Sequence, residues 1–380
     1  MRKYFPQGVA MEASFCNREK EKAALKSNIE AHEHIVLMAP RRYGKTSLVT
    51  QVLNENDFPG VHIDFFFVLT QADVTQAISE GVSTIISQLL PKSKTAYHKI
   101  IDSIIASNPK LTFNILGQKL EIGSKQTTEK NISELLLALD QFAKGAKKTC
   151  VLIFDEFQQI AELKENHAIE AAIRHAVERS QYVSYIFCGS KRHLLNEMFS
   201  DKSRPLYHLC DLMSIDRIDS EAYYPFLENM AKKKWKKSLD QDVIMEILHL
   251  TENHPYYVNA LCRRLWSMES PPVLGEVRRA WIDYINQQSV WMINDLSNLS
   301  INRRKVIMAL AAQATNEPQG KIFSTQVNLN PSTIKRCIDD LHRLDMIYLD
   351  KTNHYQVLDP ALAYFIRNKA HLKPMQLIIV

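Results

Sequence analysis

Short apolar runs alternate with amphipathic segments through the first half of the chain. Runs of this length are typical of strands that are buried on both faces. Four of them predict buried strands, at residues 35–39, 61–69, 149–157 and 183–190. Apolar residues three or four positions apart predict helices, at 45–55, 73–90, 131–142 and 168–181. This alternation indicates an α/β domain whose parallel sheet is covered on both sides.

The segment between the second and third predicted strands is less regular. Its first part carries a clear helical face, formed by Val74, Ile78, Val82, Ile85 and Leu89. Residues 91–130 are polar and weakly periodic, and we expect a variable excursion with one helix near 95–107. Asn131 and Glu134 then have the spacing of a capping box, which predicts the start of the next helix.

The pattern changes after about residue 215. From there to 297 the chain reads as helical, with breaks at Pro255 and at Pro271-Pro272. The remaining segment predicts three helices and a two-stranded wing, at 303–311, 323–330, 331–347 and 348–360. That order is typical of a winged helix-turn-helix. We therefore expect three domains, namely a core over 1–215, a helical lid over 216–298 and a winged helix over 299–380.

Composition limits the class of protein without deciding its function. The 380 residues are 46% apolar and 23% charged, with a net charge of +5, as in an ordinary globular protein of two or three domains. The six cysteines are far apart, without a C-x-x-C pair, so we expect reduced thiols in a cytoplasmic protein. The first residues lack the apolar core of a secretory signal, and no run is long enough to span a membrane.

The stretch "APRRYGKTSL", residues 39–48, carries the sharpest chemical signal. It follows a predicted strand, precedes a predicted helix, and matches the phosphate-binding pattern G-x-x-x-x-G-K-[ST] except at Ala39. Backbone N–H groups of such a loop point at phosphates, Lys45 would reach the β- and γ-phosphates, and Thr46 would ligate Mg²⁺. A methyl group at Ala39 is tolerable if its φ is negative. The predicted loop contacts are Pro40, Arg41, Arg42, Tyr43, Gly44, Lys45, Thr46 and Ser47.

A second signal lies at the end of the strand "VLIFDEF". Its position, about 110 residues after the loop, suits a Walker B motif. Asp155 would hold Mg²⁺ through water, and Glu156 would orient and deprotonate the attacking water. The alternative interpretation of Asp155-Glu156 is an exposed acidic turn after a core strand. The phosphate-binding loop upstream favours the Walker B interpretation over it.

The next strand ends in "FCGSKRHL", where Ser190 could sense the γ-phosphate. Arg192 and Arg204 are the nearest candidate arginine fingers, although each taken singly reads better as an exposed surface arginine. Lys45, Asp155, Glu156 and Ser190 form the predicted catalytic set.

Six segments occur in the order that is seen in the archaeal-type ATPase family. They are "FCNREKEKAAL", "APRRYGKTSL", "VLIFDEFQQI", "FCGSKRHLL", "SRPLY" and "NHPYYVNAL". The chain resembles this branch of the STAND class of P-loop NTPases, which is related to AAA+ proteins, over roughly residues 13–360. The resemblance implies an αβα ATPase core, a helical lid and a C-terminal winged helix, with ATP and Mg²⁺ as ligands.

The resemblance also assigns single positions. Arg18 and Glu19 match the segment that leads into the nucleotide site near the base, and His254-Pro255 match the lid motif beside the nucleotide. One departure concerns turnover. Family members often continue "PLY" with Gly-Arg, whereas in this chain Pro205-Leu206-Tyr207 is followed by His208, which places the usual arginine finger in doubt.

Two functions follow as hypotheses. The first is an ATP-hydrolysing switch, in which nucleotide state changes the docking of lid and winged helix. The second is a DNA-binding regulator in which ATP or ADP is mainly structural, with Lys335, Arg336 and Arg343 as the DNA contacts. Asp339 and Asp340 share that helix with the basic residues, which favours an intramolecular or protein contact, including a homo-oligomer, over DNA for this domain.

Overall fold

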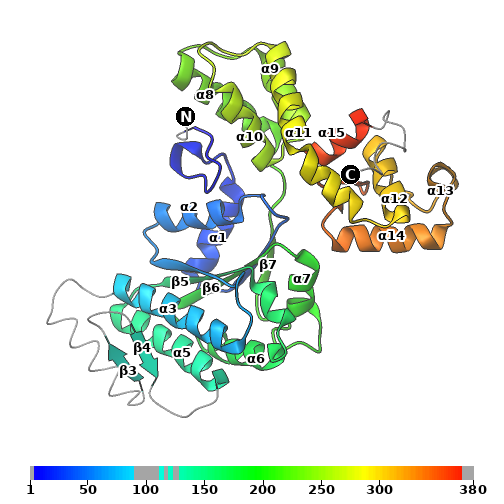
Figure 1. Ribbon diagram of the computed structural model, residues 1–380. Helices are drawn as coiled ribbons and strands as arrows, with labels where there is room; N and C mark the ends of the chain where they lie inside the picture. The colour runs from blue at the N-terminus through cyan, green and yellow to red at the C-terminus, as the bar shows by residue number, and fades with distance from the viewer. Residues whose placement is uncertain (1–3, 90–110, 115–118, 123–127, 370–380) are drawn as a thin grey trace. The chain divides into compact units, whose positions relative to one another are not determined.

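The computed structural model describes residues 4–89, 111–114, 119–122 and 128–369. The chain divides into two compact units (Figure 1). Unit 2 comprises Arg18–Arg41 and Lys45–Asp216, and unit 1 comprises Met1–Asn17, Arg42–Gly44 and Arg217–Val380. The three-residue piece Arg42–Gly44 is therefore grouped with unit 1, although its chain neighbours on both sides belong to unit 2.

Unit 2 is built on a five-stranded parallel sheet with the order β2-β5-β6-β1-β7. Its strands are β1 (Ile35–Met38), β2 (Gly60–Asp64), β5 (Cys150–Asp155), β6 (Val183–Gly189) and β7 (Asp211–Ser214). Because the three central strands are almost wholly buried, both faces of the sheet are covered. The predicted α/β class and the parallel sheet are confirmed.

The helices of unit 2 largely match their predicted positions. They are α1 (Glu19–Glu30), α2 (Lys45–Glu55), α3 (Gln71–Leu89), α5 (Thr128–Ala146), η2 (Phe157–Glu162), α6 (Asn166–Val177) and α7 (Arg192–Ser200). All five apolar residues of the predicted face of α3 are buried, each contributing about 2 kcal/mol relative to exposure. α3 packs on α5, and α5 packs on α6.

Several predictions for unit 2 are wrong in detail. The second strand ends at Asp64 rather than Leu69, because β5 is the partner of β2 among the described strands and the register of this pair ends at Asp155. Asp64 then accepts the N–H of Phe66 in a turn, which leaves Phe67 83% exposed. Asn131 is not a helix cap, since α5 begins three residues earlier at Thr128.

The irregular segment yields one element that its weak periodicity does not indicate. An antiparallel hairpin of β3 (Leu111–Asn114) and β4 (Lys119–Ile122) lies within it. The helix expected near 95–107 lies outside the described residues.

The described part of unit 1 is helical except for one hairpin and an isolated β-bridge between Thr315 and Tyr355. Its elements are η1 (Glu12–Ser14), α8 (Ser220–Trp235), α9 (Gln241–Thr251), α10 (Pro255–Leu265), α11 (Leu274–Ser297), α12 (Ile301–Ala312), α13 (Lys321–Val327), α14 (Pro331–Arg343), β8 (Ile347–Leu349), β9 (Tyr355–Val357) and α15 (Pro360–Lys369). The predicted helices and the two wing strands are present, and α15 is an addition. One hydrophobic cluster runs through these helices from Ile218 to Ile366.

Two side chains, Arg304 and Ser300, bond to the backbone at the junction between α11 and α12. The guanidinium of Arg304 donates to the carbonyls of Leu296, Ser297 and Leu299. Ser300 caps α12 through its hydroxyl. The predicted boundary between lid and winged helix at 298–299 stays a prediction, and it falls inside this hydrogen-bonded turn.

All six cysteines are free thiols, as expected. Five are buried and Cys210 is partly exposed. Burial raises the pKa of the Cys150, Cys188 and Cys262 thiols well above the usual range. Among the described residues, no helix combines the length and the apolarity that a bilayer crossing requires.

Candidate functional site

The predicted catalytic residues of unit 2 follow three strands that are adjacent in the sheet. The loop after β1 leads to Lys45, β5 ends at Asp155 with Glu156 next in sequence, and β6 is followed by Ser190. Parallel strands place their carboxyl ends at one edge of the sheet, which is where open α/β sheets bind ligands. The register confirms the alignment, since Met38 of β1 lies opposite Gly189 of β6.

In the loop after β1, the side chain of Lys45 bonds to carbonyls of the loop itself. Lys45 is the first residue of α2, and its ammonium donates to the carbonyls of Ala39 (2.8 Å) and Pro40 (3.3 Å). Ala39 is buried and is not among the residues with positive φ, so the methyl group at this position causes no backbone strain. Gly44 has φ +90°, a conformation that favours glycine. The loop is thus compatible with the departure at Ala39.

Asp155 is a partly buried carboxylate with one described hydrogen bond, from the N–H of Glu156 (3.0 Å). Burial raises the pKa of Asp155, while that N–H and the nearby positive charge of Lys45 act in the opposite direction. Thr46, the other predicted Mg²⁺ ligand, makes no hydrogen bond through its hydroxyl in the described structure. Hard oxygen donors of this kind suit Mg²⁺, so the two residues fit the predicted ion.

Glu156 has a more constrained position. Its φ is 49°, a left-handed conformation that is uncommon outside glycine and concentrates at functional sites. Its Oε2 atom accepts from the hydroxyl of Ser190 (2.8 Å) and from the amide of Gln158 (2.5 Å). Arg41 in turn donates from Nε to the Ser190 hydroxyl (3.2 Å). The structure therefore brings Glu156, Ser190 and Arg41 together.

The loop residues Arg42 and Tyr43 make their aromatic contacts within unit 1. The guanidinium of Arg42 lies 4.4 Å from the ring centre of Tyr256, and the buried Tyr43 ring lies 4.6 Å from the ring of His254. Arg42 also has a positive φ of 67°. These contacts link the loop piece of unit 1 to the start of α10.

His254 and Pro255 start α10, as predicted, with proline in the first turn. Nδ1 of His254 accepts the N–H of Tyr256 (3.3 Å), so one N–H of the first turn of α10 is capped. His254 is buried, and its pKa is well below the usual value because of that burial and the positive charges of Arg217 and Arg42. The neutral imidazole is what allows it to accept this bond.

Arg217 connects several parts of unit 1. Its guanidinium donates to the hydroxyl of Tyr43 (3.4 Å), to Glu252 at the end of α9 (2.8 Å) and to the carbonyl of Leu358 beyond β9 (2.9 Å). It also lies over the ring of Tyr348. One side chain thus contacts the loop piece, the helix before α10 and the C-terminal hairpin.

The other predicted residues have different surroundings. Arg18 is buried and donates to the carbonyl of Asp216 (2.6 Å) and to Glu21 (3.0 Å), whereas Glu19 is exposed and pairs with Lys22. Pro40 supplies a carbonyl to Lys45, and the side chain of Ser47 is partly exposed. The role of each in nucleotide binding stays a prediction.

The two candidate arginine fingers differ. Arg192 is the first residue of α7 and is partly exposed. The interpretation of Arg204 as an exposed surface arginine is wrong, because its side chain is 9% exposed and forms an ion pair with the fully buried Glu170. Arg174 donates to the carbonyls of Pro205 and Tyr207, which holds the "PLY" segment in place.

The predicted DNA contacts lie on α14. All three are exposed, and Arg343 pairs with Asp340 (3.2 Å), which also pairs with Arg303 of α12 (2.6 Å). One carboxylate therefore offsets part of the positive charge of this helix.

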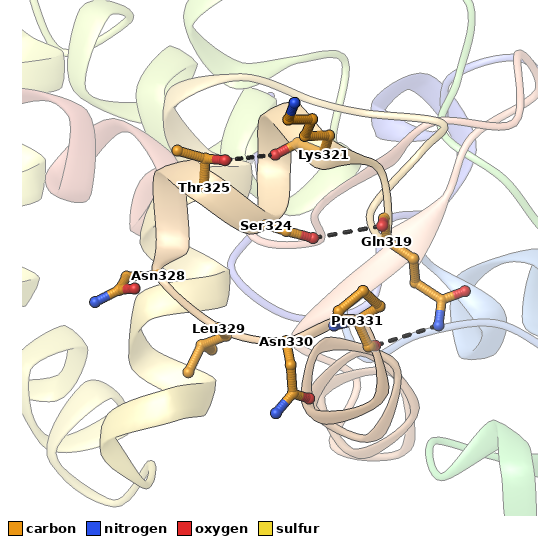
Figure 2. Close-up of a pocket in the computed structure, with 8 residues that line it drawn as sticks. All are labelled: Gln319, Lys321, Ser324, Thr325, Asn328, Leu329, Asn330 and Pro331. Atoms are coloured by element: carbon orange, nitrogen blue, oxygen red, sulfur yellow. Dashed lines mark hydrogen bonds between the residues drawn. The ribbon is translucent and has the colours of Figure 1, made fainter.

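A hollow of about 650 Å³ lies beside the turn between α13 and α14 (Figure 2). Its polar groups bond to one another: Thr325 donates to the carbonyl of Lys321, Ser324 to that of Gln319, and Gln319 to that of Pro331. It contains none of the residues that the motifs predict for nucleotide binding. Its size alone does not make it the candidate site.

Three residues beside the predicted set are not indicated by the motifs. Gln158 bonds to Glu156, Arg217 bonds to Tyr43, and His62 of β2 acts electrostatically on Asp155. Gln158 stands only two positions after Glu156, and a polar residue in the run "FQQI" is the one signal that could have drawn attention to it.

Comparisons with known proteins identify the family and the fold. Residues 15–261 match the model of the ATPase domain that is found predominantly in Archaea. An uncharacterized ATP-binding protein of Methanocaldococcus jannaschii is 24% identical over 271 residues, which cover 70% of this chain and 74% of that protein. Another, from Pyrococcus abyssi, is 22% identical over 350 residues, covering 86% and 99% of the two chains.

Two solved structures share the fold. A Walker-type ATPase of Pyrococcus abyssi superposes with a TM-score of 0.68 at 17% identity, covering 94% of this chain and 98% of its own. The ORC2 protein of Aeropyrum pernix, solved as ADPNP–ADP complexes, has a TM-score of 0.53 at 13% identity, covering 97% and 96%. Since the family model spans well over half of the residues, the chain belongs to the ATPase-domain family found predominantly in Archaea.

Proposed function

We propose that this protein binds ATP with Mg²⁺ and hydrolyses it at the edge of the sheet in unit 2. One observation carries the proposal: Lys45, the Asp155-Glu156 pair and Ser190 follow three adjacent parallel strands at their carboxyl ends. The membership in an ATPase-domain family and the ATP-binding names of two relatives support it.

Each residue has a role that its surroundings allow. Lys45 exchanges its bonds to the Ala39 and Pro40 carbonyls for phosphate oxygens. Thr46 and Asp155 hold Mg²⁺, which neutralises phosphate charge when bound. Glu156 accepts a proton from the attacking water, and Ser190 orients the Glu156 carboxylate by its hydrogen bond.

The finer proposal is a nucleotide-dependent switch. The switch proposal is supported by residues Arg42–Gly44. In sequence they belong to the phosphate-binding loop, but they are grouped with unit 1. Tyr43 contacts His254 and Arg217, and Arg217 reaches the carbonyl of Leu358 in the C-terminal segment. A nucleotide that binds two arrangements of this loop unequally would shift the balance between them.

The experiment combines phosphate release with limited proteolysis. Glu156→Gln is expected to keep ATP bound while hydrolysis slows by about 10²-fold or more, and Lys45→Ala to lose most ATP affinity with the fold retained. The protease pattern within unit 1 is expected to differ between ATP-bound Glu156→Gln and ADP-bound wild type. Equal hydrolysis by wild type and Glu156→Gln would overturn the catalytic proposal, whereas identical protease patterns would overturn the switch alone.

The DNA-binding alternative has less support in the structure. Its three contacts, Lys335, Arg336 and Arg343, are all exposed, but Arg343 is paired with Asp340. A winged helix that contacts protein, including a second copy of this chain, fits that mixed charge at least as well.

A further inference from the structure

Gln158 is a polar side chain among buried apolar neighbours. It lies in η2 between Phe157 and Ile160 and, like the aromatic ring beside it, is fully buried. A buried amide is costly unless its groups are hydrogen-bonded. Its Nε2 donates to Oε2 of Glu156 (2.5 Å), but its Oε1 has no partner in the described structure. A side chain buried with one half unsatisfied calls for an explanation other than stability.

The space for this side chain depends on a glycine. A Cβ atom at Gly189 would overlap Oε1 of Gln158, since the amide lies directly against the last residue of β6. Gly189 does not have a positive φ, so its backbone conformation does not require glycine. The absent side chain at this position therefore leaves room for the glutamine.

The two donors to Glu156 converge on one oxygen. Gln158 and Ser190 both donate to Oε2, from η2 and from the segment after β6. No described hydrogen bond engages Oε1 of Glu156. Fixing one oxygen from two sides sets the orientation of the carboxylate and leaves the other oxygen to face a water molecule.

We propose that Gln158 is a positioning residue for hydrolysis, which holds the Glu156 carboxylate in a single orientation and requires Gly189 for its own placement. This inference rests on the proposed function of Glu156 as the group that activates water. Gln158 itself touches neither nucleotide nor water in this assignment, and acts through Glu156.

The test is a double-mutant cycle on the full chain, with kcat for ATP hydrolysis and the Kd for ATP as readouts. Gln158→Met keeps the volume and removes the donor, and Gln159→Met in the same turn is the matched control, since Gln159 is only partly buried. We expect Gln158→Met to lower kcat at least about 10-fold with the Kd for ATP within about 2-fold of wild type. Gln159→Met should behave as wild type.

The double variant separates positioning from a general structural effect. Once Glu156 is Gln, no base remains to be oriented, so adding Gln158→Met should not lower kcat further. Gly189→Ala should lower kcat to a similar extent as Gln158→Met. If Gln158→Met does not fold, Gln158→Asn, which keeps an amide but is too short to reach Glu156, takes its place.

Three outcomes would overturn the proposal. One is a Gln158→Met enzyme with the kcat of wild type while Glu156→Gln is slow, which leaves the proposed function intact. Another is an additive loss in the double variant, which would mean that Gln158 acts independently of Glu156. Wild-type hydrolysis by Glu156→Gln would overturn the function of Glu156 and the positioning role together.

Discussion

Glu170 and Arg204 illustrate how a single residue can be misread from sequence. From the sequence, Arg204 is interpreted as an exposed surface arginine or an arginine finger. In the structure it forms an ion pair with Glu170 of α6, which is fully buried. Burial raises the pKa of Glu170 to about 7, even though the positive charge of Arg204 acts to lower it. The pair is therefore finely balanced between burial and attraction.

We expect Arg204→Met to destabilise unit 2 by about 3 kcal/mol at pH 8, because it leaves a buried carboxylate without its cation. The loss should be smaller at pH 5.5. Without Arg204 the pKa of Glu170 in the folded state rises further above its unfolded value, so the folded protein keeps a proton that the unfolded chain gives up as the pH rises. Thermal unfolding followed by circular dichroism at both pH values measures this.

Lys202→Met is the control, since Lys202 is exposed two positions away and its removal should change stability by less than about 0.5 kcal/mol. An Arg204→Met protein with the thermal stability of wild type but without hydrolysis would contradict this structural role and restore Arg204 as a finger.

Helices and strands with a strong apolar periodicity could be predicted from the sequence. Strands that form because their backbone pairs with a neighbouring strand could not. The face of α3 and the buried runs of β1, β5 and β6 are visible in the sequence because each buries a repeating set of apolar residues. β7 has mostly exposed side chains and exists because its backbone pairs with β1, which no local pattern shows. The same reason limits the site: the motifs point to Glu156 and Ser190, but the contact between Gln158 and Gly189 depends on how η2 lies against β6.

α14 is the element on which the DNA alternative can be tested. Asp340→Asn would release both Arg303 and Arg343 from their shared carboxylate. If α14 contacts DNA, the log–log slope of affinity against salt should become steeper by about 0.9 for each cation that gains a phosphate contact. Fluorescence anisotropy with a labelled duplex at several salt concentrations measures the slope.

Asp339→Asn provides the matched control, because it makes the same charge change on the same helix at an exposed residue with no described ion pair. Equal slopes for Asp340→Asn, Asp339→Asn and wild type would exclude the freed arginines from any DNA contact.

At the scale of the whole molecule, unit 1 is expected to lose stability in mild acid. His254 is neutral in the folded state because burial and two arginines lower its pKa. The unfolded chain takes up a proton on this residue near pH 6.5, so stability that is present above this pH is lost as the pH falls below it. At pH 5.5 the loss amounts to about 1.4 kcal/mol relative to pH 7.5.

His254→Asn should remove this pH dependence, since asparagine can also cap a helix but does not titrate. All four tryptophans lie in unit 1, at 235, 266, 281 and 291, so denaturant unfolding followed by tryptophan fluorescence reports on that unit. His249→Asn, at an exposed position of α9, is the control that should leave the pH dependence as in wild type. An unchanged slope in His254→Asn would place the acid sensitivity elsewhere.

The six thiols are divided between the two units, so their reactivity can report on the opening of each unit. Cys150, Cys188 and Cys210 belong to unit 2, and Cys16, Cys262 and Cys337 belong to unit 1. Because buried thiols with a raised pKa react only when their surroundings open, alkylation by a thiol reagent records opening events residue by residue. Mass spectrometry of the labelled peptides would time the opening of the two units separately in the native chain, and compare it between nucleotide states without an added probe.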